Sequence, residues 1–205
     1  MYKKLIDDFY NENEVKDKTF PSAQALAHFQ LRLLLNPDFS DKLLGIIDDT
    51  VFDGQPDREE MVMAEKKAIE SITNYEDIIR LMRRRIDNMS HNTLVYHAMK
   101  FQDEVVPEII RRLKTSLNDV FIEIATKVLT MCSVDIANDL IEYYDDVRNP
   151  YAQSMILLVL GFRADEAHIP WMIEKHNILK RMYPDETYSD SVIFALADME
   201  DRFYR

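Results

Sequence analysis

The sequence predicts an all-α protein, built as an α-solenoid in which antiparallel helical hairpins stack into a superhelix. Three observations support this fold class. The 205 residues include only three glycines, and no stretch alternates polar and apolar residues between turn clusters as β-strands do. Hydrophobic residues make up 47% of the chain, enough to bury a substantial core. Apolar segments recur about every 31 residues over the C-terminal two-thirds, as in helical repeat proteins.

Residues that commonly cap helices mark where the helices should begin. One helix is expected over residues 23–35. Cap-forming side chains, several of them with an acid three residues later, predict further helix starts at Ser40, at Asp57 with Glu60, at Thr73 with Glu76, at Ser116 with Asp119, at Asn149 with Pro150 and at Thr187 with Asp190. Because the connections between them are short, neighbouring helices must fold back on one another.

The apolar repeat has a clear register. It places an isoleucine in the first helix of successive hairpins, at spacings of 31, 31 and 32 residues: Ile79, Ile110, Ile141 and Ile173. Pro107 and Pro170 each lie three residues before one of these positions. We expect both prolines in the first turn of a helix, where the missing amide would have no helical partner. Asn118 and Asn149, also 31 residues apart, are expected to begin second helices.

Two segments resemble HEAT repeats of the PBS-lyase type. They are PEIIRRLKTSLNDVFIEIATKVL, with a proline near the start of its first helix, and IPWMIEKH with YPDETYSDSVIFALADM, a closing hairpin similar to those of small bacterial HEAT-repeat proteins. The resemblance covers 74–205, and 40–72 fits a degenerate repeat within one all-α domain of 1–205. It implies a binding scaffold and no particular activity, because the same fold serves many functions.

The charge of the chain disfavours nucleic acids as partners. Its formal net charge is −12 and its pI is near 4.8, so the surface should repel a phosphate backbone. Some HEAT-like proteins are DNA glycosylases, which need a basic concave surface with aromatic residues for stacking, whereas this chain has a single tryptophan, Trp171. Others are bilin lyases, whose chromophore-carrying partner nothing in the sequence indicates.

The composition also suggests a cytoplasmic protein. Cys132 is the single cysteine, so no internal disulfide is expected. The N-terminal residues are rich in acids and lack the apolar run of a secretory signal. The longest apolar stretch, 155–160, is far shorter than the roughly 20 residues that span a bilayer, so no membrane partner is expected.

No residue pattern indicates catalysis, a metal site or a cofactor. The five histidines are scattered, and Asp165 with His168 has the spacing of a helical metal site. Asp165 is interpreted as a helix cap, the commoner role of an aspartate at a helix start. No serine or cysteine lies in a nucleophile motif, and Cys132 is interpreted as a small buried filler. We therefore expect no catalytic residue, no metal ligand and no cofactor.

One basic cluster stands out in this acidic chain, and two interpretations of it are open. A functional role would be contact with an anion. The register instead aligns the cluster with Glu142 and Asp145 one repeat later, which favours a solvated ladder of surface ion pairs, each worth about 0–1 kcal/mol. The cluster consists of Arg80, Arg83, Arg84, Arg85, Arg111, Arg112 and Lys114.

These exclusions leave a non-enzymatic protein-interaction scaffold as the expected function. Its curved surface would bind a protein or peptide, and the acidity of the chain favours a basic one. Tyrosines are common in interfaces, although Tyr151 also fits a core position of its helix. The alternative is a small-molecule-binding protein or an enzyme with a groove that the sequence does not reveal. The residues expected to contact the partner are Glu123, Lys127, Gln153, Asp190, Tyr151 and Tyr188.

Overall fold

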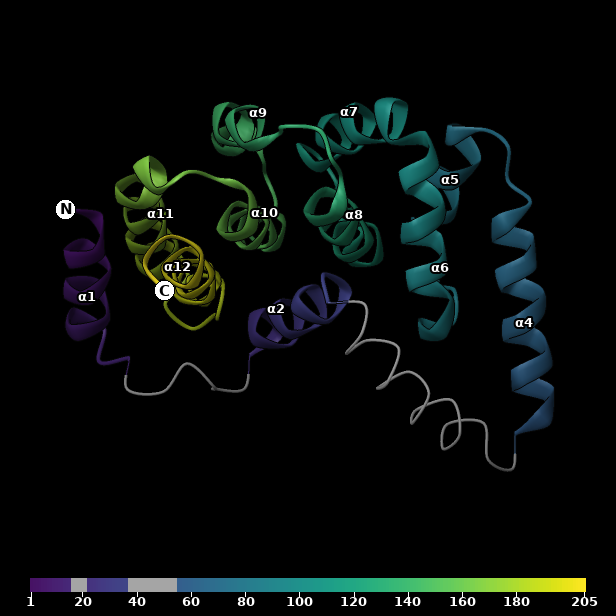
Figure 1. The fold of residues 1–205 in the computed structure, drawn as a ribbon, viewed down its shortest axis with the longest axis horizontal. Helices are drawn as coiled ribbons and strands as arrows, with labels where there is room; N and C mark the ends of the chain where they lie inside the picture. The colour runs from purple at the N-terminus through teal and green to yellow at the C-terminus, as the bar shows by residue number, and fades with distance from the viewer. Residues whose placement is uncertain (16–21, 37–54) are drawn as a thin grey trace. The chain divides into compact units, whose positions relative to one another are not determined.

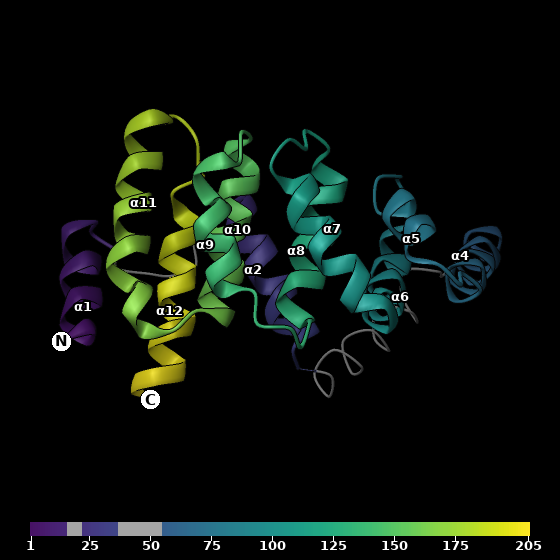
Figure 2. The same ribbon diagram turned by 90° about the horizontal axis from the view of Figure 1, so that it is seen from above.

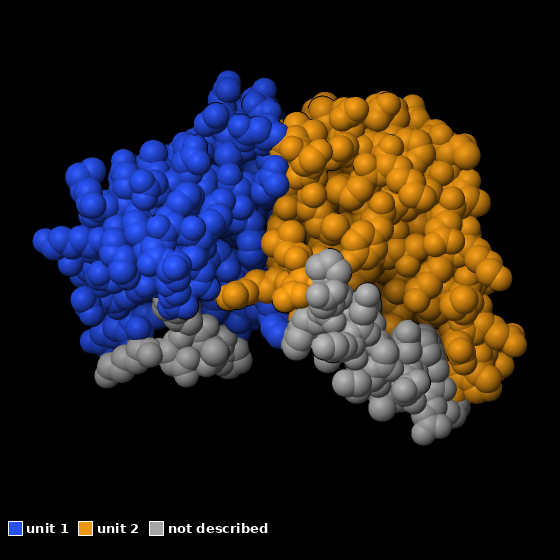
Figure 3. All heavy atoms as spheres, viewed as in Figure 1, with its two compact units in different colours: residues 1–29, 113–117, 135–205 blue, residues 30–112, 118–134 orange. Residues whose placement is uncertain are grey.

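The structure, a computed structural model, describes residues 1–15, 22–36 and 55–205. All regular structure in these ranges is helical, as the sequence predicts (Figure 1). The chain forms two compact units, coloured blue and orange in Figure 3. Unit 1 contains Met1–Phe29, Leu113–Leu117 and Asp135–Arg205, and unit 2 contains Gln30–Arg112 and Asn118–Val134. No described helix is both long enough and apolar enough to cross a membrane.

Unit 1 is built around α10, which packs against α9 and α12, while α1 packs against α11 and α12 (Figures 1 and 2). The helix α2 begins in unit 1 and ends in unit 2. The elements are α1 (Tyr2–Glu12), α2 (Ala23–Leu34), α9 (Ala137–Tyr143), α10 (Pro150–Arg163), α11 (Ile169–Met182) and α12 (Asp190–Tyr204), with the 3-10 turns η2 (Tyr144–Asp146) and η3 (Glu166–His168).

The helix α10 is buried on nearly all sides, because its apolar residues are spread around the helix rather than lying along one face. Near its end, Gly161 allows α12 to approach closely. A Cβ atom added at Gly161 would lie 2.6 Å from the Cα and 2.8 Å from the Cβ of Ala195. Arg202 of α12 then donates hydrogen bonds to the last carbonyls of α10, at 3.0 Å from Gly161 O and 2.8 Å from Phe162 O. The two helices therefore approach each other closely at this point in unit 1.

Unit 2 is built around α6, which packs against α4, α5 and α8. The helix α4 buries only Val62 and Ile69, two turns apart, on this contact. By contrast, α8 buries most of its length. The elements are α4 (Pro56–Glu70), α5 (Tyr75–Leu81), α6 (Asn88–Ala98), η1 (Met99–Phe101), α7 (Gln102–Leu113) and α8 (Asp119–Met131), the last residue of α7 belonging to unit 1.

Two of the predicted helix starts are confirmed in detail. The side chain of Asn118 accepts a hydrogen bond of 2.8 Å from the amide of Phe121, and that of Asn149 accepts one of 3.0 Å from Tyr151. Pro150 is the first residue of α10, where its missing amide leaves no helical bond unmade. An asparagine thus caps the second helix of each of these two hairpins.

Other expected starts are shifted. Asn74, rather than Thr73, caps α5 by accepting from the Asp77 amide at 2.9 Å, and α8 is capped by Asn118 rather than Ser116. In α4 the helix begins at Pro56, so Asp57 lies inside the first turn and does not cap it. The cap position of α12 is Ser189 rather than Thr187, whose hydroxyl instead donates a hydrogen bond to Gln24. The start expected at Ser40, and the whole 40–54 part of the degenerate repeat, lie outside the described residues.

The two prolines of the register have different positions. Pro170 is the second residue of α11, as expected. Pro107 lies inside α7, because that helix already begins at Gln102 and the prediction of a later start was wrong. The acids Asp103 and Glu104 favour this earlier start, since negative side chains stabilise the first turn of a helix. Pro107 has no amide hydrogen to donate, so α7 lacks one backbone hydrogen bond at this position. The packing of its apolar side chains must compensate for that loss.

The 31-residue register falls one residue away from the most deeply buried positions. Ile79 and Ile110 are buried, but Ile141 and Ile173 are only half-buried. The residues immediately before them are at most 2% exposed, one in each of α5, α7, α9 and α11: Ile78, Ile109, Leu140 and Met172. The repeat therefore marks the core of four helices, with its centre one position earlier than the isoleucines suggest.

Candidate binding site at the start of α12

Polar side chains from four parts of unit 1 come together near the start of α12. The two that lie farthest apart in sequence, Asn13 and Asp190, are separated by 177 residues. They come from the residues after α1, from the start of α2 and the residue before it, from the second half of α11, and from the start of α12 and the residues just before it. Both ribbon views show α1 beside α11 in this unit (Figures 1 and 2). The side chains are Asn13, Ser22, Gln24, His176, Lys180, Thr187 and Asp190.

Asp190 carries the acidic group of this site. It is the first residue of α12 and is half-buried. The Ser22 hydroxyl hydrogen-bonds its carboxylate and also accepts the amide of Ala25 at 3.1 Å, at the start of α2. Burial raises the pKa of Asp190, and the Ser22 hydrogen bond and the Lys180 charge oppose that rise. The carboxylate is therefore incompletely compensated for its lost hydration.

His176 is the buried base of the site and is only 2% exposed. Its Nδ1 lies 2.9 Å from the carbonyl oxygen of Ser189, and its Nε2 lies 3.2 Å from Oδ1 of Asn13. The same Asn13 oxygen accepts a hydrogen bond of 2.9 Å from Lys180. Burial lowers the pKa of His176, and the charge of Lys180 lowers it further. These contacts fasten the end of α1 to α11 and α12.

The side-chain amide nitrogen of Gln24 is a buried hydrogen-bond donor without an acceptor among the described residues. Its side chain is fully buried, and its Oε1 accepts a hydrogen bond of 2.7 Å from the Thr187 hydroxyl. Its Nε2 has no hydrogen-bond partner within the residues that the structure describes. Since an unmade hydrogen bond of a buried amide costs about 1–3 kcal/mol, an acceptor placed there would stabilise the site.

Two tyrosines precede this acid in the chain. The rings of Tyr183 and Tyr188 meet edge to face, with centroids 5.5 Å apart, and both side chains are half-buried. Tyr188 is two residues before Asp190, so aromatic faces and a carboxylate occur within one short segment. Aromatic faces attract cations through their quadrupole, and carboxylates attract them by charge. The combination suits a lysine or arginine side chain.

The same chemistry already holds a lysine elsewhere in unit 1. Lys175 Nζ lies 2.7 Å from Asp145 Oδ1, 5.3 Å from the ring centroid of Tyr144 and 5.4 Å from that of Trp171. Lys175 is buried although Asp145 is exposed. An ammonium group buried in this protein is thus held by one carboxylate and two aromatic rings.

The six sequence-predicted contact residues fall in both units. In unit 1, Asp190 and Tyr188 lie in the site above, whereas Tyr151 and Gln153 are half-buried near the start of α10. The Gln153 amide donates a hydrogen bond of 2.9 Å to the carbonyl of Val147, so this side chain supports its own helix start. Their role in partner contact stays a prediction.

Glu123 and Lys127 lie one turn apart on α8 of unit 2. Glu123 is exposed and Lys127 is half-buried. Burial lowers the pKa of Lys127, against the attraction of Glu123, and Lys127 in turn helps burial lower the pKa of His91 on α6. These residues form a separate polar group within unit 2.

The basic cluster is paired differently from the expected ladder. Within their own helices, Arg80 bonds to Asp77 at 2.6 Å and Arg111 bonds to Glu108 at 2.7 Å. Lys114 reaches the following hairpin, but at Asp146 (3.4 Å) rather than Asp145, which is occupied by Lys175. Acids three residues away on the same helix are within easier reach than those of another hairpin, which accounts for the intrahelical pairs.

The other residues considered as metal ligands or nucleophiles have structural surroundings. Asp165 occupies the cap position of η3, although its side chain makes no capping hydrogen bond. Cys132 is fully buried. Within the described residues, no three His, Cys, Asp or Glu side chains gather in a way that could hold a metal ion.

Sequence reasoning missed Asn13, Ser22, Gln24 and His176 as members of the site. Each is an ordinary polar residue of its segment, and no motif links residues 13, 24 and 176. Only the packing of α1 and α2 against α11 and α12 brings them together. Among known proteins, no family model matches the chain, and no match was found among curated proteins or solved structures.

Proposed function

We propose that this protein is a non-enzymatic, HEAT-like interaction module that binds a basic segment of a protein or peptide. The observation that carries the proposal is the half-buried carboxylate of Asp190, which follows Tyr188 and its ring partner Tyr183 in the same short segment of the chain. A lysine or arginine of the partner would restore the electrostatic stabilisation that burial takes from this carboxylate. The net charge of −12 would attract such a partner over a longer range.

The α-solenoid architecture is part of the same proposal. It is supported by the buried positions that recur about every 31 residues along the chain, one in each of α5, α7, α9 and α11. It is also supported by the packing of second helices within each unit, α6 with α8 and α10 with α12. Stacked hairpins of this kind present extended surfaces for partners.

The proposal can be tested with a synthetic peptide that carries four lysines separated by glycines, with both ends blocked. We expect Asp190→Asn to weaken its binding by about tenfold or more, because hydrogen bonds to charged groups are worth about 1.5–3 kcal/mol. Isothermal titration at low salt measures the affinity. The matched control is Asp185→Asn, which removes an exposed carboxylate from the same loop. Equal affinities of the two variants would contradict the proposal.

Lys180 provides a second test with the opposite sign. Its charge lies near Asp190 and opposes the rise in the pKa of that carboxyl. Lys180→Gln removes this internal competitor, so the same peptide should bind more tightly to it than to a variant that loses an equal charge away from Asp190. Because the substitution also makes the protein more acidic, Arg181→Gln on the neighbouring exposed position serves as the charge control.

A small polar ligand is the second candidate, and the unpartnered Nε2 of Gln24 favours it. Such a ligand would offer an acceptor to Gln24 and a cationic group to Asp190. A thermal-shift screen of amino acids and small amines would detect it through the stabilisation that binding confers. A ligand that shifts the wild-type midpoint, but not that of Gln24→Leu or Asp190→Asn, would support this function over peptide binding.

A further inference from the structure

The turn between α5 and α6 of unit 2 carries three consecutive exposed arginines, Arg83, Arg84 and Arg85. Within the described residues, none of the three forms an ion pair with a carboxylate. In this respect they differ from Arg80 and Arg111, which are paired within their own helices. The ladder expected from sequence therefore does not account for this arginine triad.

The backbone of the triad is held in place. The amides of Arg83 and Arg84 bond back to the carbonyls of Arg80 (3.3 Å) and Leu81 (2.9 Å). The carbonyl of Arg83 accepts a hydrogen bond of 3.1 Å from the side chain of Asn118. Met82, directly before the triad, is fully buried. A fixed backbone lowers the entropy lost when a ligand orders the side chains.

The residues after the triad are fixed as well. Asp87 caps α6 by accepting from the Met89 amide at 3.0 Å, and its own amide donates to Glu65 of α4 at 3.1 Å. Arg58 of α4 bonds to both carboxylate oxygens of Asp87, at 3.1 and 3.3 Å. The turn is therefore anchored to α4, α6 and α8.

The carboxylates nearest in sequence are already engaged. Asp77 is bonded by Asn74 and Arg80, which lower its pKa, and Asp87 is bonded by Arg58, which lowers the pKa of that carboxyl. Both acids therefore stay ionised and remain with these partners. The positive charge of the triad is left for an external anion.

We propose that Arg83, Arg84 and Arg85 bind a phosphoryl group carried on a segment of a protein partner. A phosphoserine has about two negative charges and three acceptor oxygens, which suit several guanidinium groups at once. A single carboxylate has only one negative charge and two acceptor oxygens. An extended nucleic acid is disfavoured because Glu76 and Asp77 on α5 and the net charge of −12 repel phosphates beyond the triad.

This inference is independent of the site at Asp190, which lies in unit 1 and selects cations. The probe is a degenerate peptide library with a fixed central phosphoserine, compared with the same library carrying serine. Fluorescence anisotropy or library enrichment at physiological salt measures binding. We expect the wild-type protein to prefer the phosphorylated library by at least tenfold, and the triple variant R83Q/R84Q/R85Q to lose that preference.

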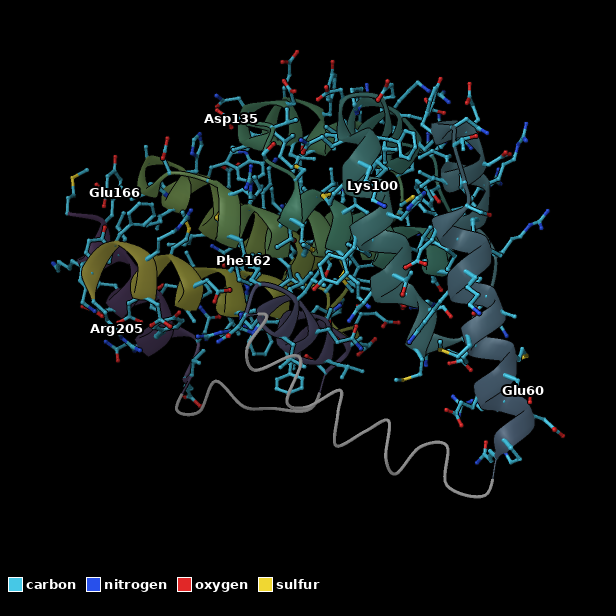
Figure 4. All side chains as sticks on the ribbon, turned by 45° about the vertical axis from the view of Figure 1, so that its right-hand side comes forward. Glu60, Lys100, Asp135, Phe162, Glu166 and Arg205 are labelled. Atoms are coloured by element: carbon cyan, nitrogen blue, oxygen red, sulfur yellow. The ribbon has the colours of Figure 1, made fainter. Side chains whose placement is uncertain are left out.

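The matched control is K100Q/R148Q/R181Q, which removes the same charge from three exposed positions elsewhere (Lys100 is labelled in Figure 4). It should keep the preference, and circular dichroism should show both triple variants folded, because all six positions are exposed. Equal binding of both libraries, or an undiminished preference in R83Q/R84Q/R85Q, would overturn the proposal. So would stronger binding to a single-stranded oligonucleotide than to the phosphorylated library. The Asp190→Asn variant should behave as the wild type here.

Discussion

His28 of α2 and Asp198 of α12, 170 residues apart, meet in a buried contact of 2.6 Å between Nε2 and Oδ2. The imidazole lies between the rings of Phe162 and Phe194, with centroid distances of 5.8 and 5.2 Å, at the end of α10 where Phe162 is labelled in Figure 4. One polar contact, enclosed by aromatic rings, thus connects the start of the chain to its last helix. Its partners cannot easily be rehydrated if one is lost.

We therefore expect Asp198→Ala to lower the free energy of unfolding by about 1–3 kcal/mol, since it leaves the buried imidazole without its partner. Urea denaturation followed by circular dichroism measures the change. Asp8→Asn, at an exposed carboxylate of α1, should change it by less than about 0.5 kcal/mol. The double variant His28→Phe with Asp198→Leu should recover part of the loss, because neither polar group then remains; a loss as large as in Asp198→Ala would argue against the explanation.

Gly161→Ala should destabilise unit 1. An alanine in a helix interior is normally better than glycine by about 1 kcal/mol, but here its Cβ would lie 2.6 Å from the backbone of Ala195. Overpacking of this kind costs about 1–3 kcal/mol, so the net effect on thermal midpoint should be a decrease. Adding Ala195→Gly should restore little, because the closest atom is the Cα. Full rescue by that second change would show that α12 can move aside.

Acid should weaken the pairing of Glu108 with Arg111 and Arg112. The two arginines lower the pKa of Glu108 from 4.5 to about 2. The Glu108 carboxyl therefore binds a proton less tightly in the folded protein than in the unfolded chain. The stability that this ion pair contributes is complete above about pH 4.5 and is lost as the pH falls toward 2. Glu108→Gln should reduce stability at pH 7 by no more than about 1 kcal/mol per exposed pair, and the difference from wild type should vanish at low pH.

The docking of α1 should also depend on pH, through His176. Its folded pKa is lowered by burial below the ordinary value of 6.5, so the unfolded state takes up the proton more readily. Stability from this group is therefore complete above pH 6.5 and decreases as the pH falls below it. Hydrogen exchange of α1 amides should be faster at pH 5.5 than at pH 7.5 after correction for intrinsic rates. His176→Gln should remove that difference, and an unchanged ratio in the variant would assign it to another group.

The sequence was sufficient to predict several of the helix starts. Asn118 and Asn149 cap helices by local hydrogen bonds, which depend on residues two or three positions away, and these starts were predicted correctly. The position of Pro107 was not, because the preference of proline for a first turn was outweighed by the acids that begin α7 earlier. Local chemistry predicts a helix start only where no stronger neighbour competes.

The site was largely beyond prediction. The sequence pointed to Asp190 and Tyr188 by their character, but their surroundings come from Ser22, Gln24 and His176, whose contacts depend on how distant helices pack. A repeat register gives the spacing of buried positions and not the side chains that meet across helices. The same limitation applies to the pairing of Lys175 with Asp145, 30 residues away.

Four consecutive residues, Tyr143 to Asp146, receive two lysines from opposite directions in the chain. Lys114 lies 3.8 Å from the Tyr143 ring centroid and 3.4 Å from Asp146, while Lys175 takes Tyr144 and Asp145. The first and last of the four residues therefore contact Lys114, and the two middle residues contact Lys175. The number of residues in this turn is therefore as constrained as their identity. Deleting one residue would displace an aromatic ring or a carboxylate from each of the two lysines. The turn is for this reason a poor place for insertions or loop grafting.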